Sequence, residues 1–219
     1  MTEYTLHADI KDWYSKVSNP VEVKVGEYIV DVINEDGLLI EIQTRNLSAI
    51  KKKLRKLVQS NKVRLVYPIA KIKWIVHVSE SGKILRKRKS PKNGKLTDLF
   101  VELVHLPSLI VHENFSFEVL FIEEKEIRCN DGKGSWRRKG ISTKDRKLIK
   151  IFENIVFEDK RDFLEVLPSD LDELFTNKNL ANKMGVSLRL AQKITYCLRK
   201  MNVLTVVAKK RRELVFKIV

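Results

Sequence analysis

Hydrophobic and polar positions follow different periods along the N-terminal part of the chain, and these periods predict a mixture of helices and strands. Apolar residues recur at helical spacing in residues 5–17. Residues 21–33 and 38–44 form strand-like runs, and the Asp36-Gly37 pair between them is a strong hairpin signal. Residues 46–61 carry an apolar stripe typical of an amphipathic helix. The predicted order is therefore helix, paired strands and helix.

The middle of the chain predicts further strands and helices. Residues 63–70 form a short, almost wholly apolar strand, which is typical of a sheet covered on both faces, and residues 73–79 form another. Residues from Asp98 onward favour a helix that ends before Pro107, and residues 115–129 favour a long strand. Residues 143–157 are predicted to return to helix. The apolar residues expected on one side of this last helix are Leu148, Ile149, Phe152 and Ile155.

Two basic segments interrupt these elements. Residues 79–97 and 130–142 follow neither helical nor strand periodicity, which predicts exposed loops or hairpins. Within the second segment, Trp136 is placed either to stack on a nucleic-acid base or to pin its loop against the body of the protein. The candidate DNA-binding residues of the two segments are Arg86, Lys87, Arg88, Lys89, Trp136, Arg137, Arg138 and Lys139.

The sequence pattern changes near residue 170. From there it predicts helix, helix, turn, helix, strand, basic turn and strand. Gly185 is placed to end one helix in a left-handed conformation, and Ser187 can cap the next. We therefore predict two domains, residues 1–168 and residues 169–219.

This C-terminal order of elements resembles the winged helix-turn-helix family over residues 172–219. In that family the second helix enters the major groove and the hairpin touches phosphates. The resemblance implies a DNA-binding face, although a winged helix can also pack against another protein. The residues that it assigns to DNA are Ser187, Arg189, Gln192, Lys193, Tyr196, Lys209, Lys210, Arg211 and Arg212.

The hairpin near the N-terminus carries acids among its apolar residues. Asp31 lies in one strand, and Glu41 and Gln43 share a face of the next. Two carboxylates brought together repel unless a cation joins them, and carboxylate oxygens suit Mg²⁺ or Mn²⁺. The backbone carbonyl of Ile42 can add a further ligand. The pattern therefore predicts a divalent-metal site formed by Asp31, Glu41 and Ile42.

The spacing Asp-x9-Glu-x-Gln within this order of elements resembles the PD-(D/E)xK nuclease superfamily over residues 5–76. The resemblance implies a restriction-endonuclease-like α/β (α+β) fold, a mixed sheet flanked by helices, followed by the winged helix domain. It assigns metal binding to Asp31 and Glu41, and it makes Asp31, Glu41 and Gln43 the catalytic set. The metal would lower the pKa of the attacking water and stabilise charge on the phosphate. Arg45 and Lys51 would supply positive charge near that phosphate.

Gln43 separates two interpretations, because this position usually holds Lys in the superfamily. Some members carry Gln there and still cut, since an amide can orient a water although it cannot act as a base. Gln43 can equally mark a weakened or lost activity. A further interpretation places Asp31 and Glu41 on the solvent side of an ordinary hairpin, paired with Lys or Arg.

Composition favours nucleic acid as the partner. The 219 residues carry a formal net charge of +15, and a basic surface attracts phosphate backbone. Charges interrupt every apolar run before it reaches membrane-spanning length, and the N-terminus lacks the layout of a signal peptide. Two distant cysteines indicate no disulfide framework. We therefore expect a cytoplasmic protein with no membrane partner.

These patterns lead to two main hypotheses and a third. The first is a DNA-binding, Mg²⁺- or Mn²⁺-dependent endonuclease that hydrolyses phosphodiester bonds of double-stranded or branched DNA. The second is a non-catalytic DNA-binding or regulatory protein with a degenerate nuclease fold. The third is an interaction protein whose winged helix binds a partner subunit. The sequence leaves undecided whether the protein forms a homodimer, because no residue pattern argues for or against one.

Overall fold

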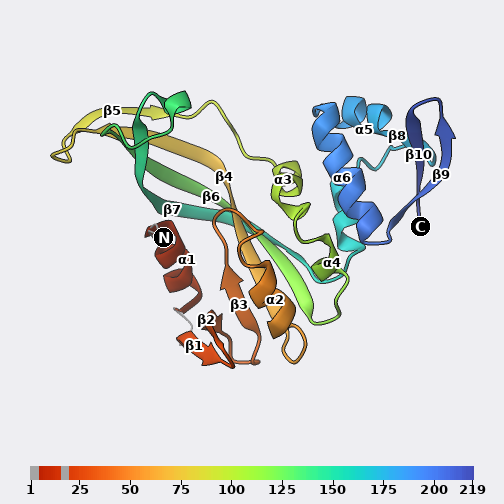
Figure 1. Ribbon diagram of the computed structural model, residues 1–219, viewed down its shortest axis with the longest axis horizontal. Helices are drawn as coiled ribbons and strands as arrows, with labels where there is room; N and C mark the ends of the chain where they lie inside the picture. Colours follow the sequence, from red (N-terminus) through yellow and green to blue (C-terminus); the bar gives the residue numbers. More distant parts are fainter. Residues whose placement is uncertain (1–4, 16–19) are drawn as a thin grey trace. The chain divides into compact units, whose positions relative to one another are not determined.

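The computed structural model confirms an architecture of mixed α and β structure (Figure 1). The structure describes residues 5–15 and 20–219. Its elements in chain order are α1 (Thr5–Ser15), β1 (Val21–Val25), β2 (Tyr28–Ile33), β3 (Leu39–Ile42), α2 (Lys51–Leu57), β4 (Val63–Val78), β5 (Ile84–Lys89), η1 (Leu96–Leu99), α3 (Phe100–Leu103), α4 (Pro107–Ile110), β6 (Phe115–Asn130), η2 (Trp136–Arg138), β7 (Ile141–Phe157), η3 (Asp162–Val166), β8 (Phe175–Thr176), α5 (Asn177–Met184), α6 (Leu188–Lys200), β9 (Leu204–Lys210) and β10 (Glu213–Ile218). Within these residues one sheet has the order β1-β2-β3-β4-β6-β7, with β5 also paired to β4, and a second sheet has the order β8-β10-β9.

The chain folds into two compact units, and each unit is assembled from three segments. The first comprises Met1–Thr44, Val66–Lys95 and Val119–Ile155, and the second comprises Arg45–Leu65, Leu96–Glu118 and Val156–Val219. The long strands β4, β6 and β7 contribute residues to both units. The boundary predicted between residues 168 and 169 falls inside the second unit and stays a prediction.

The core of the first unit forms where α1 packs on the sheet. Leu6 and Ile10 lie one helical turn apart on α1, and both are fully buried. The strands contribute alternate residues to this core, since alternate side chains share a face of a strand. Each fully buried Leu or Ile contributes roughly 1.5–3 kcal/mol, so this cluster is the main anchor of α1. Its strand residues are Val32, Ile40, Ile42, Val66, Leu120 and Ile122.

Polar groups of α1 also bind the outer edge of the sheet. β7 is the last strand in the sheet order, so one side of it has no neighbouring strand. Asp9 Oδ2 accepts a hydrogen bond of 2.8 Å from the backbone N–H of Leu148 in β7. Asp145 of β7 in turn accepts bonds of 2.9 and 2.7 Å from the backbone N–H and the hydroxyl of Thr5. The Asp9 bond satisfies one backbone N–H on an edge that would otherwise be open to another strand.

The prediction of a helix over residues 143–157 is wrong, because these residues form most of β7. Leu148 and Ile151 pack against the core, whereas Ile149 and Phe152 are 49% and 39% exposed. The apolar residues fit helical spacing locally, but the pairing partner of β7 is the long strand β6. Sequence windows do not report that long-range pairing, which here overrides the local period.

Three other boundaries differ from the expectation. The two strands predicted over residues 63–79 form a single strand, β4. The helix predicted to end before Pro107 is broken into η1 and α3, and Pro107 itself begins a further short helix, α4. Proline suits the first turn, where no intrahelical partner awaits its missing N–H. The helix predicted over residues 46–61 is confirmed only in its central part, α2.

The C-terminal module of the second unit confirms the predicted order of helix, turn, helix and β-hairpin. Thr176 accepts a hydrogen bond from the backbone of Asn179 at the start of α5, and Gly185 ends this helix with φ +61°. Ser187 then caps α6 by accepting a bond from the backbone N–H of Leu190. The helix predicted just before α5 is instead a turn followed by β8, which pairs with β10. Inside the module, the ring centroids of Phe175 and Phe216 lie 5.9 Å apart.

The turn between α5 and α6 gives a test of the backbone argument. Replacing Gly185 by Ala should destabilise the protein by about 1–2 kcal/mol, since the left-handed conformation is costly for a residue with a Cβ atom. No other atom lies within 4 Å of the added Cβ, so the cost is purely backbone strain. The Gly185→Asn variant is the matched control, because Asn tolerates this conformation. Urea unfolding should rank wild type, Asn and then Ala in order of stability; equal losses for Ala and Asn would contradict the argument.

Candidate functional site

The structure brings Asp31 to the strand that carries Glu41 and Gln43. In the antiparallel pair β2 and β3, Val32 lies opposite Ile40 and Ile33 lies opposite Leu39. Beyond it, Asp31 Oδ2 accepts a hydrogen bond of 2.8 Å from the backbone N–H of Ile42. A side chain thus replaces the next backbone contact of the ladder. Asp31 therefore contacts the second strand at Ile42, and the predicted meeting of the Asp31 and Glu41 carboxylates stays a prediction.

His7 reaches the same point from α1. Its Nε2 atom lies 3.0 Å from the carbonyl oxygen of Ile42 and 3.3 Å from Asp31 Oδ2. A carboxylate oxygen, a carbonyl oxygen and an imidazole nitrogen therefore converge. The sequence argument missed His7, because the four histidines show no zinc spacing. A usable signal was present: His7 lies three residues before the buried Ile10, which places it on an inward side of the predicted helix.

Glu41 and Gln43 flank Ile42 in the chain and lie in different environments. Glu41 is 1% exposed within β3, whose four residues are all buried. A buried carboxylate is costly unless a cation or hydrogen-bond donors surround it, as they do both in a metal site and in a structural ion pair. Gln43 is half-buried, and its backbone N–H donates a bond of 2.9 Å to the carbonyl of Val66.

The donor atoms at this point fit a small divalent cation in kind. Oxygen ligands from a carboxylate and a carbonyl suit Mg²⁺ and Mn²⁺, and an imidazole also suits Mn²⁺. Across residues 5–15 and 20–219, no group of three or more His, Cys, Asp or Glu side chains is arranged to hold a metal ion. The set is therefore Asp31, His7 and one carbonyl, with Glu41 adjacent. Mg²⁺ is commonly held by one or two carboxylates together with substrate phosphates, so a sparse protein set is compatible with it.

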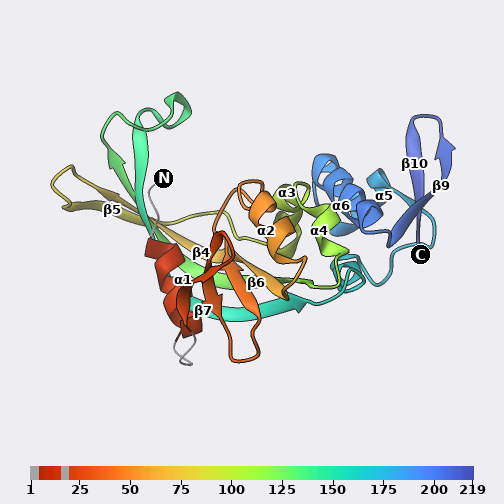
Figure 2. The same ribbon diagram turned by 60° about the horizontal axis from the view of Figure 1, so that its bottom comes forward.

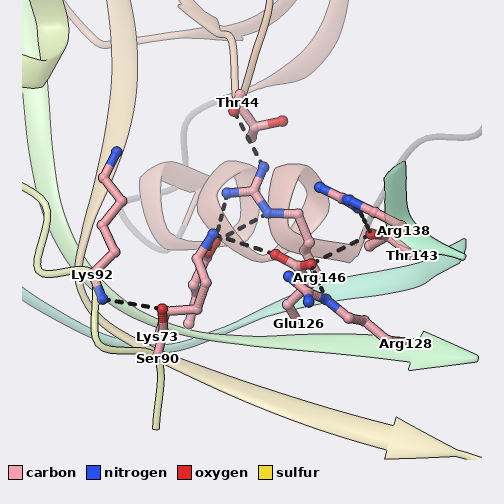
Figure 3. Close-up of polar contacts among 10 residues, drawn as sticks. Thr44, Lys73, Ser90, Lys92, Glu126, Arg128, Arg138, Thr143 and Arg146 are labelled. Carbon is pink, nitrogen blue, oxygen red and sulfur yellow. Dashed lines mark hydrogen bonds and ion pairs between the residues drawn. The ribbon is translucent and has the colours of Figure 1, made fainter. Parts of the chain in front are cut away.

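A second polar cluster lies on β4, β6 and β7 of the first unit (Figure 3). Glu124 is fully buried, with Oε1 2.7 Å from the Lys73 ammonium and Oε2 2.6 Å from a terminal guanidinium nitrogen of Arg146. Another guanidinium nitrogen of Arg146 donates a bond of 3.2 Å to the carbonyl of Thr44. The cluster thereby holds the chain just after Gln43.

Glu126 extends this cluster toward the β6–β7 hairpin. Arg128 Nε donates a bond of 2.6 Å to Glu126 Oε1, and the Lys73 ammonium lies 3.3 Å from Oε2. Burial alone would raise the pKa of Glu126, but the hydrogen bond from Arg128 and the charges of Lys73 and Arg128 together hold that pKa below its ordinary value. The sequence argument missed Glu124 and Glu126, although alternating glutamates in an apolar strand are a signal of buried charge.

The first basic segment is a hairpin rather than a loop. β5 pairs with β4 and presents Arg86, Lys87 and Lys89 to solvent, while Arg88 is half-buried. The Lys87 ammonium lies 4.7 Å from the ring centroid of Trp74, which explains how that Trp is covered. Burial, followed by the charges of Arg128, Arg88 and Arg86, lowers the pKa of the neighbouring His77. That shift reports a positive field along the hairpin.

The second basic segment contains a short 3-10 turn, η2. Trp136 at its start is 82% exposed, so it does not pin the loop against the body of the protein. Arg137, Arg138 and Lys139 follow it directly and are also exposed. The exposure rules out the interpretation in which Trp136 pins its loop, and stacking on a nucleic-acid base stays a prediction.

A basic cavity on α2 adds residues that the sequence argument missed. The cavity has a volume of about 530 Å³. Its lining includes four cations and no acid. Lys51 was predicted to lie near a phosphate, whereas its neighbours were not singled out. The lining residues are Ser48, Lys51, Lys52, Arg55, Lys56 and Gln59.

The predicted DNA face of α6 is largely exposed. Arg189, Gln192 and Tyr196 recur at helical spacing on the side away from the module's core, and all three are exposed. Lys193 is half-buried, and its ammonium donates a bond of 3.1 Å to the carbonyl of Val101 in α3. Ser187 is exposed and caps the helix. The hairpin tip, residues 209–212, is exposed at every position.

Residues 4–158 match a family described as a domain of unknown function, DUF8091, and this match spans more than half of the chain. The chain belongs to the DUF8091 family. An uncharacterized protein of Treponema pallidum (strain Nichols) is 34% identical over 190 residues, covering 86% of this chain and 76% of that protein. No solved structure matches the chain.

The DUF8091 match includes the Asp31 site, both basic hairpins and the Glu124 cluster, whereas the α5–β10 module lies after it. Among the described residues, no helix is long and apolar enough to cross a membrane. Cys129 and Cys197 are buried and are not joined in a disulfide.

The Glu124 cluster predicts a large effect on stability. Glu124→Gln should lower the free energy of unfolding by about 2–4 kcal/mol, because it leaves Arg146 without its buried counter-charge and Lys73 with Glu126 as its remaining one, while the partial exposure of both cations lets water offset some of the loss. Urea denaturation followed by circular dichroism measures this change. The control is Glu153→Gln, which removes a half-exposed pair with Lys71 and should cost at most about 1 kcal/mol. Equal effects of the two variants would contradict a special role for the buried cluster.

Proposed function

We propose that this protein binds DNA through its C-terminal module, acting as a winged helix-turn-helix. The observation that carries the proposal is the exposed stripe of Arg189, Gln192 and Tyr196 on α6, next to a β-hairpin whose tip is wholly basic. The left-handed Gly185 between the helices and the pairing of β8 with the hairpin support the same interpretation. A partner with a phosphate backbone complements the charge of both elements.

The stripe on α6 suggests a division of contacts. Arg and Gln can bind guanine and adenine edges in the major groove, so Arg189 and Gln192 are the candidates for base contact. Lys193 is a poorer candidate, because its ammonium already donates to the Val101 carbonyl. The cations at residues 209–212 would contact phosphates, which position the module without specifying sequence.

Further basic surfaces support a nucleic-acid partner over a protein partner. The hairpin of β4 and β5, the turn η2 and the cavity on α2 all present several cations and few acids. A net charge of +15 spread in this way favours counterion release on DNA binding. The expected binding is therefore strongly dependent on salt concentration.

We propose as a second function that residues 5–76 have a restriction-endonuclease-like fold and that the protein cleaves phosphodiester bonds with Mg²⁺ or Mn²⁺. The observation behind it is the convergence of Asp31 Oδ2 and the Ile42 carbonyl at His7 Nε2. The acidic hairpin after α1 and the helix α2 after it match the order of that fold. Buried Glu41, one residue before Ile42, is the further carboxylate such a site requires.

The roles of the residues follow from their chemistry. Asp31, Glu41 and the carbonyl of Ile42 would hold the cation, which when bound lowers the pKa of water and neutralises charge on the phosphate. Gln43 would orient the attacking water through its amide and would not take its proton. The Thr44 carbonyl is fixed by Arg146, so the end of β3 keeps its position while substrate binds.

A specific observation also favours the non-catalytic alternative. Asp31 Oδ2 accepts the Ile42 N–H at 2.8 Å, so this acid already has a structural role in joining β2 to β3. Gln43 cannot act as a general base. A DNA-binding protein with a degenerate site would keep Asp31 for the first reason alone. Cleavage, rather than binding, separates the two proposals.

The nuclease proposal predicts metal-dependent cleavage that needs both acids. Wild type should cut labelled duplex, nicked or branched DNA in the presence of Mg²⁺ or Mn²⁺. Cleavage should stop when EDTA removes the metal. Asp31→Asn and Glu41→Gln should each lower the rate about 100-fold or more, since each removes several kcal/mol of charge stabilisation. Asp36→Asn is the matched control, because this acid is exposed in the turn of the same hairpin and should cut like wild type.

Two outcomes would decide against cleavage. If wild type cuts none of the substrates while every variant binds DNA as wild type does, the site is degenerate and the non-catalytic alternative holds. If the purified protein cuts but Asp31→Asn and Glu41→Gln cut equally well, the activity belongs to another site or to a contaminant.

The binding proposal predicts different effects for base and phosphate contacts. Arg189→Ala should weaken binding to a selected site by about 1–3 kcal/mol and relax sequence preference there. Lys210→Ala should weaken binding to all sequences and reduce the slope of log K against log salt by about 1. Lys217→Ala, which removes a cation 2.8 Å from Glu173, is the control and should change neither quantity. Fluorescence anisotropy across a salt series measures all three; equal behaviour of the three variants would contradict a DNA-binding module.

A further inference from the structure

The tip of the β6–β7 hairpin holds one apolar side chain among cations. The hairpin extends away from α1, and its tip carries the turn η2 (Figure 2). In residues 131–140, Trp136 is the single large apolar residue, and it is 82% exposed. The guanidinium carbon of Arg137 lies 5.4 Å from the centroid of the indole ring. An isolated indole beside a cation lacks the apolar surroundings of a protein-binding patch.

The backbone of the tip is held by a network that fixes where Trp136 lies. Asp131 accepts bonds from the backbone N–H of Lys133 at 3.1 Å and from the Ser142 hydroxyl at 2.9 Å, and its carboxylate lies 3.0 Å from the Lys144 ammonium. These contacts join the two strands directly below the tip. The hydrogen bond from Lys144 is the main reason that the pKa of Asp131 falls to about 2, so the network persists at neutral pH.

Close backbone contact above this network adds to the constraint. The N–H of Gly134 donates a bond of 3.0 Å to the carbonyl of Gly140. A Cβ atom at Gly134 would lie 2.0 Å from the carbonyl oxygen of Ile141, so only glycine fits there. The Arg138 guanidinium donates a bond of 3.1 Å to the Thr143 hydroxyl, which fixes the turn that carries the indole. Trp136 is thus exposed on a constrained turn, so its display costs little further ordering when a ligand binds.

We propose that Trp136 stacks on an unpaired base, and that the DNA bound by this protein therefore contains unpaired nucleotides, as in flaps, gaps or branches. The inference rests on the proposed DNA binding and names its substrate class. In a continuous duplex every base already stacks on its neighbours, so inserting an indole costs a few kcal/mol of unstacking. An unpaired base offers a free face, and stacking on an aromatic side chain contributes about 1–3 kcal/mol. Arg137 and Lys139 are exposed next to Trp136 and would contact neighbouring phosphates.

The test compares two DNAs of the same sequence in EDTA, so that no cleavage occurs. One is a continuous duplex, and the other carries a short single-stranded flap containing 2-aminopurine. Trp136→Ala should weaken flap binding about 5- to 150-fold and leave duplex binding within about 2-fold, since stacking is lost only where a base is free. Trp136→Phe should restore most of the flap affinity. Wild type and Trp136→Phe should quench 2-aminopurine fluorescence, and Trp136→Ala should not.

Matched controls separate this inference from DNA binding itself. Arg189→Ala in α6 should weaken both DNAs by the same factor, because it acts on duplex contacts. If Trp136→Ala changes neither DNA, or changes both equally, base stacking is overturned while DNA binding stands; an unchanged affinity would leave the indole as a protein contact. If Trp136→Phe fails to restore flap affinity, stacking is also overturned. If wild type binds neither DNA, the proposed function and this inference both fall.

Discussion

The buried carboxylate of Glu124 constrains how three strands of the first unit lie together. A fully buried carboxylate needs opposite charge at close range, and here Lys73 comes from β4 and Arg146 from β7 on either side of β6. Three strands must therefore keep a fixed register for the charge to be tolerated. Arg146 then uses its remaining nitrogen on the Thr44 carbonyl. The same charge cluster that orders the sheet thus also fixes the chain beside the candidate site.

α1 connects that ordered sheet to the acidic hairpin. Thr5 and Asp9 lie four residues apart, on one side of the helix, and both bind the edge strand β7. His7 lies two residues from each, about 200° around the helix axis, and reaches Ile42 and Asp31 instead. The helix is therefore held by the Leu148 backbone and the Asp145 side chain of β7 on one side and meets the donor atoms of β2 and β3 on the other. A site of this kind is positioned by regular elements rather than by loops.

Local signals predicted much of the fold and part of the site. Asp36-Gly37 specified the β2–β3 hairpin, and Gly185 with Ser187 specified the turn between α5 and α6, because those signals act within a few residues. The strand β7 was not predicted, because the spacing of apolar residues within a short stretch of sequence does not show that the stretch pairs with β6. His7 and Glu124 were missed for the same physical reason. The role of His7 depends on Ile42, which is 35 positions away in the sequence. The role of Glu124 depends on Arg146, which is 22 positions away.

The distribution of acids links the fold to the proposed DNA binding. Glu124 and Glu126 bind cations that are half-buried, and Asp131 binds the ammonium of Lys144. Asp9 and Asp145 bind backbone or hydroxyl groups of the sheet and α1. These acids serve internal contacts, so they do little to offset the exposed cations on β5, η2, α2 and the β9–β10 tip. Much of the net charge of +15 is therefore presented on solvent-facing elements, where it attracts phosphate over a long range. In the proposed complex this attraction would bring the DNA close before the exposed indole of Trp136 could meet a base.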